Sequence, residues 1–421
     1  MLQSVAGMIG ISIYVLADTF FISVYAGADG LAVLNLILPV YGLIYAIGCM
    51  VGIGSATRYS ITKARGDNAD FYFLQAIAWS VLISIPFVLT GIFIPDKLLQ
   101  LLGADAGLTA LGCGYIRIIL IASPFFICNY SFTAFARNDH APMTAMLGSI
   151  AGSMFNIIFD YIFMFSLHLG LPGAALATAF CPIVTMSICS THYLGKHNHV
   201  PFHWRRLSFK RFLSCCQLGI SAFVGEFSNG IIAMVFNMLL LHIAGNIGVA
   251  AYGIVANLSV VAMSIFNGLA QGAQPLISES YGKEQHIQVK QLIRWSIITC
   301  LTVELLVVVC IWCFTDPLIA IFNSENNAQL LYYAHTGLRL YFLGFLFAGI
   351  NIMLVAYFSA VDNVRPAVVG SILRGAVAII ICAVVFSMLF GINGVWTSFF
   401  GSEVITFAAI TLLSRKEKKS L

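Results

Sequence analysis

Long apolar stretches follow one another along almost the whole chain, with short polar segments between them. A helix that crosses a membrane needs about 20 predominantly apolar residues, and 421 residues can supply about twelve such spans. The predicted spans are residues 2–25, 31–56, 70–94, 112–136, 142–166, 172–194, 212–242, 249–277, 289–315, 332–358, 365–388 and 394–414. The pattern therefore predicts an all-α polytopic membrane protein, since the short alternating segments of a transmembrane β-barrel are absent from the sequence.

The second half of the chain aligns with the first at an offset that drifts from about 216 to 222 residues. The matched positions are Gly27 with Gly245, Gly30 with Gly248, Gly54 with Gly272, Trp79 with Trp295, Ser80 with Ser296, Asp96 with Asp316, Arg117 with Arg339, and Gly173 with Gly394. Each half holds six spans, an even number, so the two repeats are predicted to be related by a pseudo-two-fold axis along the membrane normal. A duplicated six-span unit is typical of a secondary transporter.

The repeat predicts an N-terminal lobe over residues 1–195 (spans 1–6), a linker over 196–211, and a C-terminal lobe over 212–421 (spans 7–12). The linker is basic and rich in histidine, at His197, His199 and His203. No carboxylate or thiol lies near these histidines in the sequence, so we interpret the linker as a solvated loop and not as a metal site.

Composition supports this class. Hydrophobic residues make up 60% of the chain and charged residues only 9%, which excludes an ordinary soluble protein. With a cytoplasmic N-terminus, Lys97 is the only basic residue of the outer loops, Arg117, Arg339 and Arg374 fall within spans, and the other Lys and Arg residues lie in inner loops and the tail. Both termini are therefore predicted to be cytoplasmic. The net charge of +4 reflects this topology, and no nucleic-acid partner is expected.

Acidic residues inside the membrane are costly and mark candidate functional sites. Asp18 of span 1 and Asp160 of span 5 each lie about six or seven residues below the outer ends of their spans. Asn156 is one turn from Asp160 on the same helix face, Thr178 of span 6 lies at the same depth, and Tyr14, one turn below Asp18, could hydrogen-bond into the group. The second repeat has Phe236, Ala378, Cys382 and Phe399 near the matching positions, so the duplicated fold does not require these polar groups.

Oxygen ligands of this kind suit a proton or a hard cation such as Na⁺. Two carboxyl groups in one poorly solvated pocket repel each other, so the pair can hold one proton, or hold Na⁺ when both are ionised. The plainer alternative is that each polar side chain only caps a helix or joins two helices.

Further polar residues lie within span 7. Glu226, Asn229 and Asn237 occupy one arc of about 80° on this helix, and Met234 lies beside them. We interpret these residues, with Gln274 of span 8, as the lining of a substrate cavity; hydrogen bonding between helices is the alternative. For Glu304, Glu403 and Arg374 the expected role is pairing between helices.

The chain resembles the multidrug and toxic compound extrusion (MATE) transporters, particularly the bacterial MepA-like and DinF-like branches. The resemblance covers essentially the whole chain and is carried by the segments ADTFFISVYAGADGLA in span 1, NIIFD in span 5, GAALAT in span 6, and VAAYGIVANLS and GLAQGAQPLISESYG in span 8. It implies an antiporter that exports organic cations and drugs in exchange for Na⁺ or H⁺. It also places the family's amino-lobe cation site on Asp18, Asn156, Asp160 and Thr178, with Tyr14 alongside.

The related NorM-like branch uses carboxylates of the carboxyl lobe instead. Glu226 lies close to that branch's span-7 acid, but its span-10 acid has no counterpart between Tyr332 and Phe358. The resemblance therefore favours the amino-lobe site.

Other functions remain open at this point. A lipid or lipid-linked oligosaccharide flippase of the same superfamily is the alternative, although few basic residues lie within spans to meet an anionic cargo. A membrane enzyme would need paired Asp-rich motifs for Mg²⁺ and diphosphate, and Asn138-Asp139 stands alone. We therefore expect no enzyme and no cofactor beyond the coupling ion. We expect the protein to be a monomer in a bacterial plasma membrane. Its expected substrates are cationic amphiphilic drugs. Met1–Gly7 has no charged segment, so no cleavable signal is predicted.

Overall fold

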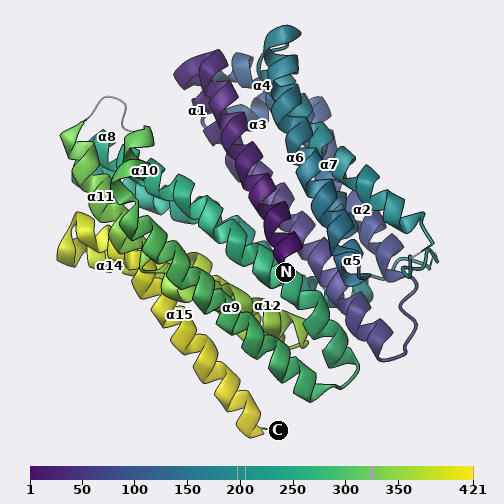
Figure 1. The fold of residues 1–421 in the computed structure, drawn as a ribbon. Coiled ribbons are helices and arrows are strands. Elements are labelled where there is room, and N and C mark those ends of the chain that lie inside the picture. Colours follow the sequence, from purple (N-terminus) through teal and green to yellow (C-terminus); the bar gives the residue numbers. More distant parts are fainter. Residues whose placement is uncertain (197, 204, 323–326, 421) are drawn as a thin grey trace. The chain divides into compact units, whose positions relative to one another are not determined.

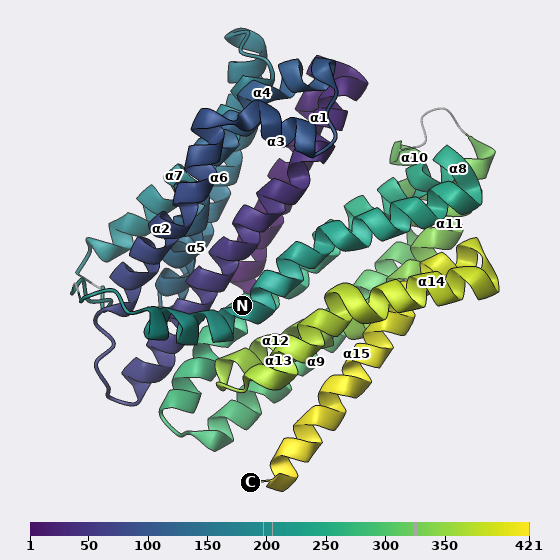
Figure 2. The ribbon, with the colours of Figure 1, turned by 180° about the vertical axis from the view of Figure 1, so that it is seen from behind.

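The computed structural model describes residues 1–196, 198–203, 205–322 and 327–420. Helices make up nearly all of this part of the chain (Figure 1), and Figure 2 shows the same helices from behind. They are α1 (Leu2–Ala64), α2 (Tyr72–Phe93), α3 (Pro95–Leu101), α4 (Ala106–Ile121), α5 (Ser123–Asn138), α6 (Pro142–Tyr161), the π-helix η1 (Ile162–Ser166), α7 (Leu171–Tyr193), α8 (Phe209–Gly282), α9 (His286–Cys313), α10 (Thr315–Phe322), α11 (Ala328–Phe342), α12 (Phe345–Ala360), α13 (Val364–Ile372), the π-helix η2 (Leu373–Val377), α14 (Ala378–Phe390) and α15 (Ile392–Ser420).

The predicted number of spans is confirmed. Within the described residues, nine helical segments are long and apolar enough to cross a membrane, and two bent helix pairs raise the number to eleven. The 74-residue helix α8 counts once among these, although its backbone at Gly245 is not helical (φ 63°, ψ −157°). Because a straight helix of that length would be more than three times as long as a membrane is thick, α8 supplies two spans and the total becomes twelve.

Two of the predicted spans are not single helices. Residues 112–136 fall on α4 and α5, and residues 332–358 fall on α11 and α12, and each of these pairs is bent by 44°. Proline in the first turn of α5 lacks a backbone N–H, so the α4 hydrogen-bond ladder cannot continue through it. The prediction of continuous helices was therefore wrong at both places. The two bends lie at equivalent positions of the two repeats.

The internal repeat is visible in the backbone. Gly27 (φ 58°, ψ −140°) and Gly245 (φ 63°, ψ −157°) break the helices α1 and α8 at matching points. Gly170 (φ 60°) precedes α7, and Gly391 (φ 59°) precedes α15 in the same way. Side chains with a Cβ rarely adopt this left-handed region, so glycine at these four positions fixes where each repeat turns. The two-repeat, all-α fold class is thereby confirmed.

The chain forms two compact units. Unit 1 comprises Met1–Glu226 and Ser278–Gln285, and unit 2 comprises Phe227–Ile277 and His286–Leu421. Both ends of α8 thus belong to unit 1 and its middle to unit 2. In unit 1, a Cβ on Gly282 would lie 2.6 Å from the Ala64 Cβ, so the last turn of α8 packs closely on the last turn of α1.

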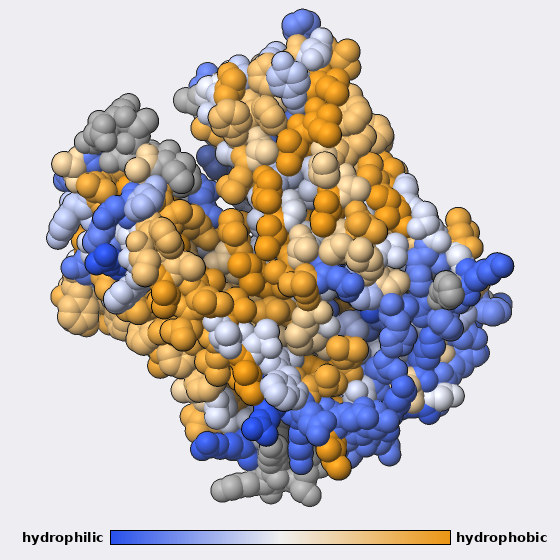
Figure 3. All heavy atoms as spheres, in the orientation of Figure 1, coloured by the Kyte–Doolittle hydropathy of each residue, from blue (hydrophilic) through white to orange (hydrophobic). Residues whose placement is uncertain are grey.

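The outer faces of the helices are apolar, as expected for contact with lipid. On α6, Met154 and Ile158 are 58% and 51% exposed, whereas Asn156 and Asp160 on the other face are fully buried. Figure 3 shows hydrophobic side chains over the helices of unit 1 and hydrophilic ones at the end where the segment after α7 lies. A bundle with polar groups inside and apolar groups outside is stable in a bilayer and not in water.

Candidate functional site

The candidate site is built on the close contact between α6 and α7 of unit 1. Gly148, Gly152, Asn156 and Asp160 repeat at intervals of four residues, so they share one face of α6. A Cβ on Gly152 would lie 2.5 Å from the Thr185 Oγ1, and the Thr185 hydroxyl donates across to the Gly148 carbonyl at 3.0 Å. The two glycines let the helices approach, and the next two turns then bring Asn156 and Asp160 against α7.

Asn156 links three of the predicted residues. It is fully buried, and Thr178 on α7 is 4% exposed. Oriented to satisfy both neighbours, the Asn156 amide donates to the Asp160 Oδ2 at 3.2 Å and accepts at its oxygen from the Thr178 hydroxyl, also at 3.2 Å. The structure therefore brings Asn156, Asp160 and Thr178 together.

Asp18 of α1 lies close to this group. It is 8% exposed, and its carboxyl group interacts electrostatically with that of Asp160. Tyr115 of α4, 4% exposed, interacts electrostatically with both carboxyl groups. The sequence did not predict a role for Tyr115, because a tyrosine in an apolar span carries no charge that marks it as a candidate.

One oxygen of each carboxyl group has no donor. Within the described part of the chain, the Oδ1 atoms of Asp18 and Asp160 are buried and have no hydrogen-bond partner. A buried carboxylate oxygen without a donor is unfavourable, so each of these atoms provides a place for a proton or a cation.

Tyr14 makes contacts other than the predicted ones. Its hydroxyl lies 3.1 Å from the Tyr45 hydroxyl and 3.4 Å from that of Tyr41, both on the second part of α1. Tyr41 and Tyr45 are one helical turn apart, so their hydroxyls can meet the same partner. The expected hydrogen bond from Tyr14 into the acidic group is corrected to a cluster of three tyrosines.

The donor set suits a light cation. Carboxylate, amide and hydroxyl oxygens are ligands for a proton or a hard monovalent ion, and soft ligands are not among them. The residues that the structure describes hold no cluster of three or more His, Cys, Asp or Glu side chains arranged for a metal ion. Two carboxyl oxygens with an amide and a hydroxyl nearby therefore fit H⁺ or a hard cation such as Na⁺.

The predicted cavity residues lie along α8 and differ in exposure. Glu226 is partly buried and interacts electrostatically with Cys49 of α1 and Tyr130 of α5. Asn229, Met234 and Asn237 are exposed. Gln274, near the other end of α8, is 8% exposed. The polar arc predicted for span 7 thus consists of one partly buried acid, Glu226, followed by exposed amide and thioether side chains.

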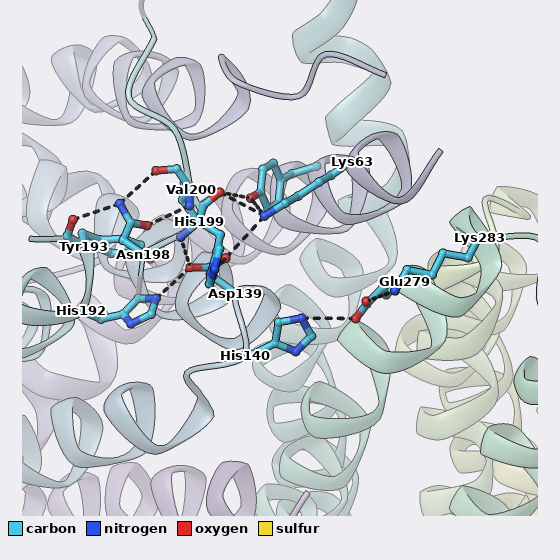
Figure 4. A network of polar contacts seen from close by, with 11 residues as sticks. Lys63, Asp139, His140, His192, Tyr193, Asn198, His199, Val200, Glu279 and Lys283 are labelled. Atoms are coloured by element: carbon cyan, nitrogen blue, oxygen red, sulfur yellow. Dashed lines mark hydrogen bonds and ion pairs between the residues drawn. The ribbon is translucent and has the colours of Figure 1, made fainter. Parts of the chain in front are cut away.

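A second polar cluster surrounds Asp139, in the turn between α5 and α6 (Figure 4). Its carboxylate accepts hydrogen bonds from the His192 ring at 2.9 Å and from the His199 backbone N–H at 2.8 Å. Lys63 of α1 lies 3.6 Å from the other oxygen and donates to the His199 carbonyl at 3.0 Å. One buried carboxylate thus joins α1, α7 and the linker.

The cluster around Asp139 shows that the linker is only partly solvated. The prediction of a solvated loop is confirmed for the side chains of His199 and His203, which are 67% and 76% exposed. It is wrong for the backbone, because Asp139 binds the His199 N–H and Val200 is 1% exposed. His197 lies outside the described residues.

The fold and the buried polar groups within it define a polytopic membrane transporter. The MatE family model matches residues 4–162 and 222–385, which is most of the chain. The chain therefore belongs to the MatE family, and it is a transporter and not an enzyme.

Known proteins agree with this assignment. The chain is 27% identical to the multidrug export protein MepA of Staphylococcus saprophyticus over 411 residues, which cover 95% of this chain and 89% of the relative. MepA of Staphylococcus aureus is 26% identical over the same length and coverage. Among solved structures, an outward-facing multidrug resistance MATE family transporter of the MOP superfamily matches with a TM-score of 0.91 at 22% identity, covering 99% of this chain and 95% of that one. A MOP superfamily transporter from Pyrococcus furiosus has a TM-score of 0.89 at 23% identity, with coverages of 99% and 94%.

Proposed function

We propose that this transporter is a secondary antiporter that exports cationic amphiphilic drugs in exchange for H⁺ or Na⁺. The observation that carries the proposal is the pair of buried carboxyl groups of Asp18 and Asp160, each with one oxygen that finds no donor among the described residues. The names of the relatives add support, since multidrug export is the function that they state for MepA.

The coupling follows from the chemistry of this pair. Two ionised carboxylates in one buried site repel each other, and a bound proton or Na⁺ removes this repulsion. A cation that binds one conformation of the protein better than another shifts the population toward the first. Cation entry at Asp18 and Asp160 would thus favour one side of an alternating-access cycle, and export of the drug would accompany return to the other.

The remaining residues have roles in the same proposal. Asn156 positions Asp160 by a hydrogen bond, and Thr178 holds Asn156 by another. The residues that meet the drug are Glu226, Asn229, Met234, Asn237 and Gln274. A carboxylate attracts a cationic substrate, and exposed methionine adapts to differently shaped apolar groups. We place the protein as a monomer in a bacterial plasma membrane with both termini in the cytoplasm.

Transport by the purified protein in lipid vesicles tests the proposal, with ethidium as the cationic probe. Na⁺ and pH gradients are imposed separately, and ethidium movement is followed by fluorescence. We expect ethidium to move in the direction opposite to the flow of one of the two cations, H⁺ or Na⁺. In vesicles without protein we expect no ethidium movement. Ethidium movement that is the same with and without both gradients would contradict antiport, and transfer of a fluorescent phospholipid between leaflets would favour a flippase.

A further inference from the structure

Another group of buried charges lies in unit 2 and consists of residues to which the proposed function gives no role. Glu304 on α9, Asn351 on α12 and Glu403 on α15 are all fully buried, and Arg374 on the π-helix η2 is 19% exposed at its side chain. These elements are neighbours in Figure 2, and α12 packs on both α9 and α15. A π-helix inside a longer helix is rare and often occurs at functional sites, and Arg374 lies on such a segment.

Glu403 is fully compensated. Arg374 Nε donates to its Oε1 at 2.7 Å, and the Asn351 amide donates to its Oε2 at 2.7 Å. The pairing between helices that the sequence predicted is confirmed for Arg374 and Glu403. With a cation on one oxygen and an amide donor on the other, Glu403 is stable as a carboxylate.

Glu304 is not compensated in this way. Its Oε1 accepts from the Ile350 backbone N–H at 2.8 Å. Within the ranges that the structure describes, its Oε2 is buried and has no hydrogen-bond partner, and the same is true of the Asn351 Oδ1. The cation of the cluster, Arg374, is paired with Glu403 and contacts the Met263 sulfur at 3.2 Å. An ionised Glu304 would therefore be a fully buried negative charge whose compensation comes from the backbone N–H groups of Ile350 and Gly349 on one side and not from a cation, which costs free energy.

The packing around Glu304 decides what can neutralise it. A Cβ on Gly349 would lie 2.5 Å from the Phe266 ring and 2.8 Å from the Glu304 Oε1, so the carboxyl group is enclosed on that side. A metal ion needs several oxygen ligands around it, and among the described residues of this cluster the oxygens that lack partners are the Glu304 Oε2 and the Asn351 Oδ1. A proton needs no such space and turns Oε2 from an acceptor without a donor into a hydroxyl group.

We propose that Glu304 is a proton-binding site of unit 2, separate from Asp18 and Asp160, and that it is protonated in this conformation. The carboxyl group exchanges this proton when a change in helix packing admits water to it. The site goes beyond the proposed function, which places the coupling cation in unit 1, and its protonation does not depend on whether the chain exports drugs.

Infrared spectroscopy of the full-length protein in lipid tests the proposal, because only a protonated carboxyl group has a carboxylic acid carbonyl band. At neutral pH, Glu304→Gln should remove part of this band, whereas the control Glu279→Gln, at a partly exposed glutamate paired with Lys283, should leave it unchanged. Addition of Na⁺ at constant pH should not alter the Glu304 contribution. An unchanged band in Glu304→Gln would overturn the proposal, and so would a Glu304 band that Na⁺ removes, since Na⁺ would then be the ligand.

A second measurement avoids dependence on the folding of that variant. In this measurement the glutamate carboxyl groups carry ¹³C, which shifts every glutamate band away from the bands of Asp18 and Asp160. The protein also carries Glu226→Gln, so that Glu226 does not contribute to the shifted band. A shifted carboxylic acid band at neutral pH would support protonation of Glu304, because Glu403 is paired with Arg374. Absence of a shifted band would overturn the proposal, even if transport driven by Asp18 and Asp160 is intact.

Discussion

The carboxylate of Asp139 accepts a hydrogen bond from the backbone N–H of His199 at 2.8 Å, although the two residues lie 60 positions apart. The same carboxylate binds the His192 ring, and it is 1% exposed. A buried carboxylate with several donors holds the segment that follows α7 against α1 and the α5–α6 turn. The linker between the two repeats is thereby anchored to unit 1 at its first half.

This anchor leads to a prediction about stability. Asp139→Ala should lower the free energy of unfolding by about 1–3 kcal/mol, because it leaves the His199 N–H and the His192 ring without their acceptor. The measurement is the thermal unfolding midpoint of the purified protein in detergent. Asp67→Ala, at an exposed position of the α1–α2 turn, is the control and should leave the midpoint unchanged. Equal midpoints for Asp139→Ala and the wild type would show that the anchor contributes nothing.

The two acids of unit 1 should be required for coupling and dispensable for folding. Asp18→Asn and Asp160→Asn should each reduce gradient-driven efflux to background, since neither variant retains two carboxyl groups for the cation. Both should remain monodisperse, because an amide costs less than a carboxylate to bury. Efflux from cells and size-exclusion chromatography of the purified variants provide the measurements. Gradient-driven efflux at the wild-type rate in both variants would eliminate the site.

Thr178 should tune this site through Asn156. Thr178→Val removes the hydroxyl that donates to the Asn156 amide and keeps the side-chain shape, so it should loosen the position of Asp160. Loss of one such hydrogen bond is worth about 1 kcal/mol, which corresponds to about a fivefold higher half-saturating concentration of the coupling cation. Thr178→Ser retains the hydroxyl and should behave like the wild type. If the valine and serine variants have the same cation dependence, the hydroxyl has no role in positioning.

Glu226 should discriminate between substrates by charge. If its carboxylate meets the drug, Glu226→Gln should weaken export of a monovalent cationic drug on the order of tenfold, which corresponds to ~1.4 kcal/mol of attraction. Export of a neutral compound should change little, and Glu284→Gln, at an exposed position after α8, should affect neither. The comparison uses half-saturating drug concentrations in vesicles. An equal loss for charged and neutral compounds would assign Glu226 to structure.

Several features of the fold could be predicted because they depend on local sequence. A run of apolar residues long enough to cross a membrane must form a helix there, since no water is present to satisfy the backbone groups. The positions of Gly27 and Gly245 mark the breaks because few other residues adopt their backbone angles. Continuity of a helix was harder to predict. The bends between α4 and α5 and between α11 and α12 lie inside apolar runs, where hydropathy does not change.

The sequence by itself determined the spans, the repeat and the depth of each polar residue, because helical rise converts position into distance along one helix. Only the tertiary structure decided which polar groups meet, because that depends on how helices are rotated and packed against each other. Helical spacing placed Asn156 beside Asp160, but the packing of α6 on α7 brought Thr178 to the same amide. Packing likewise directed Tyr14 to Tyr41 and Tyr45, paired Arg374 with Glu403, and left Glu304 buried with one oxygen that has no donor among the described residues.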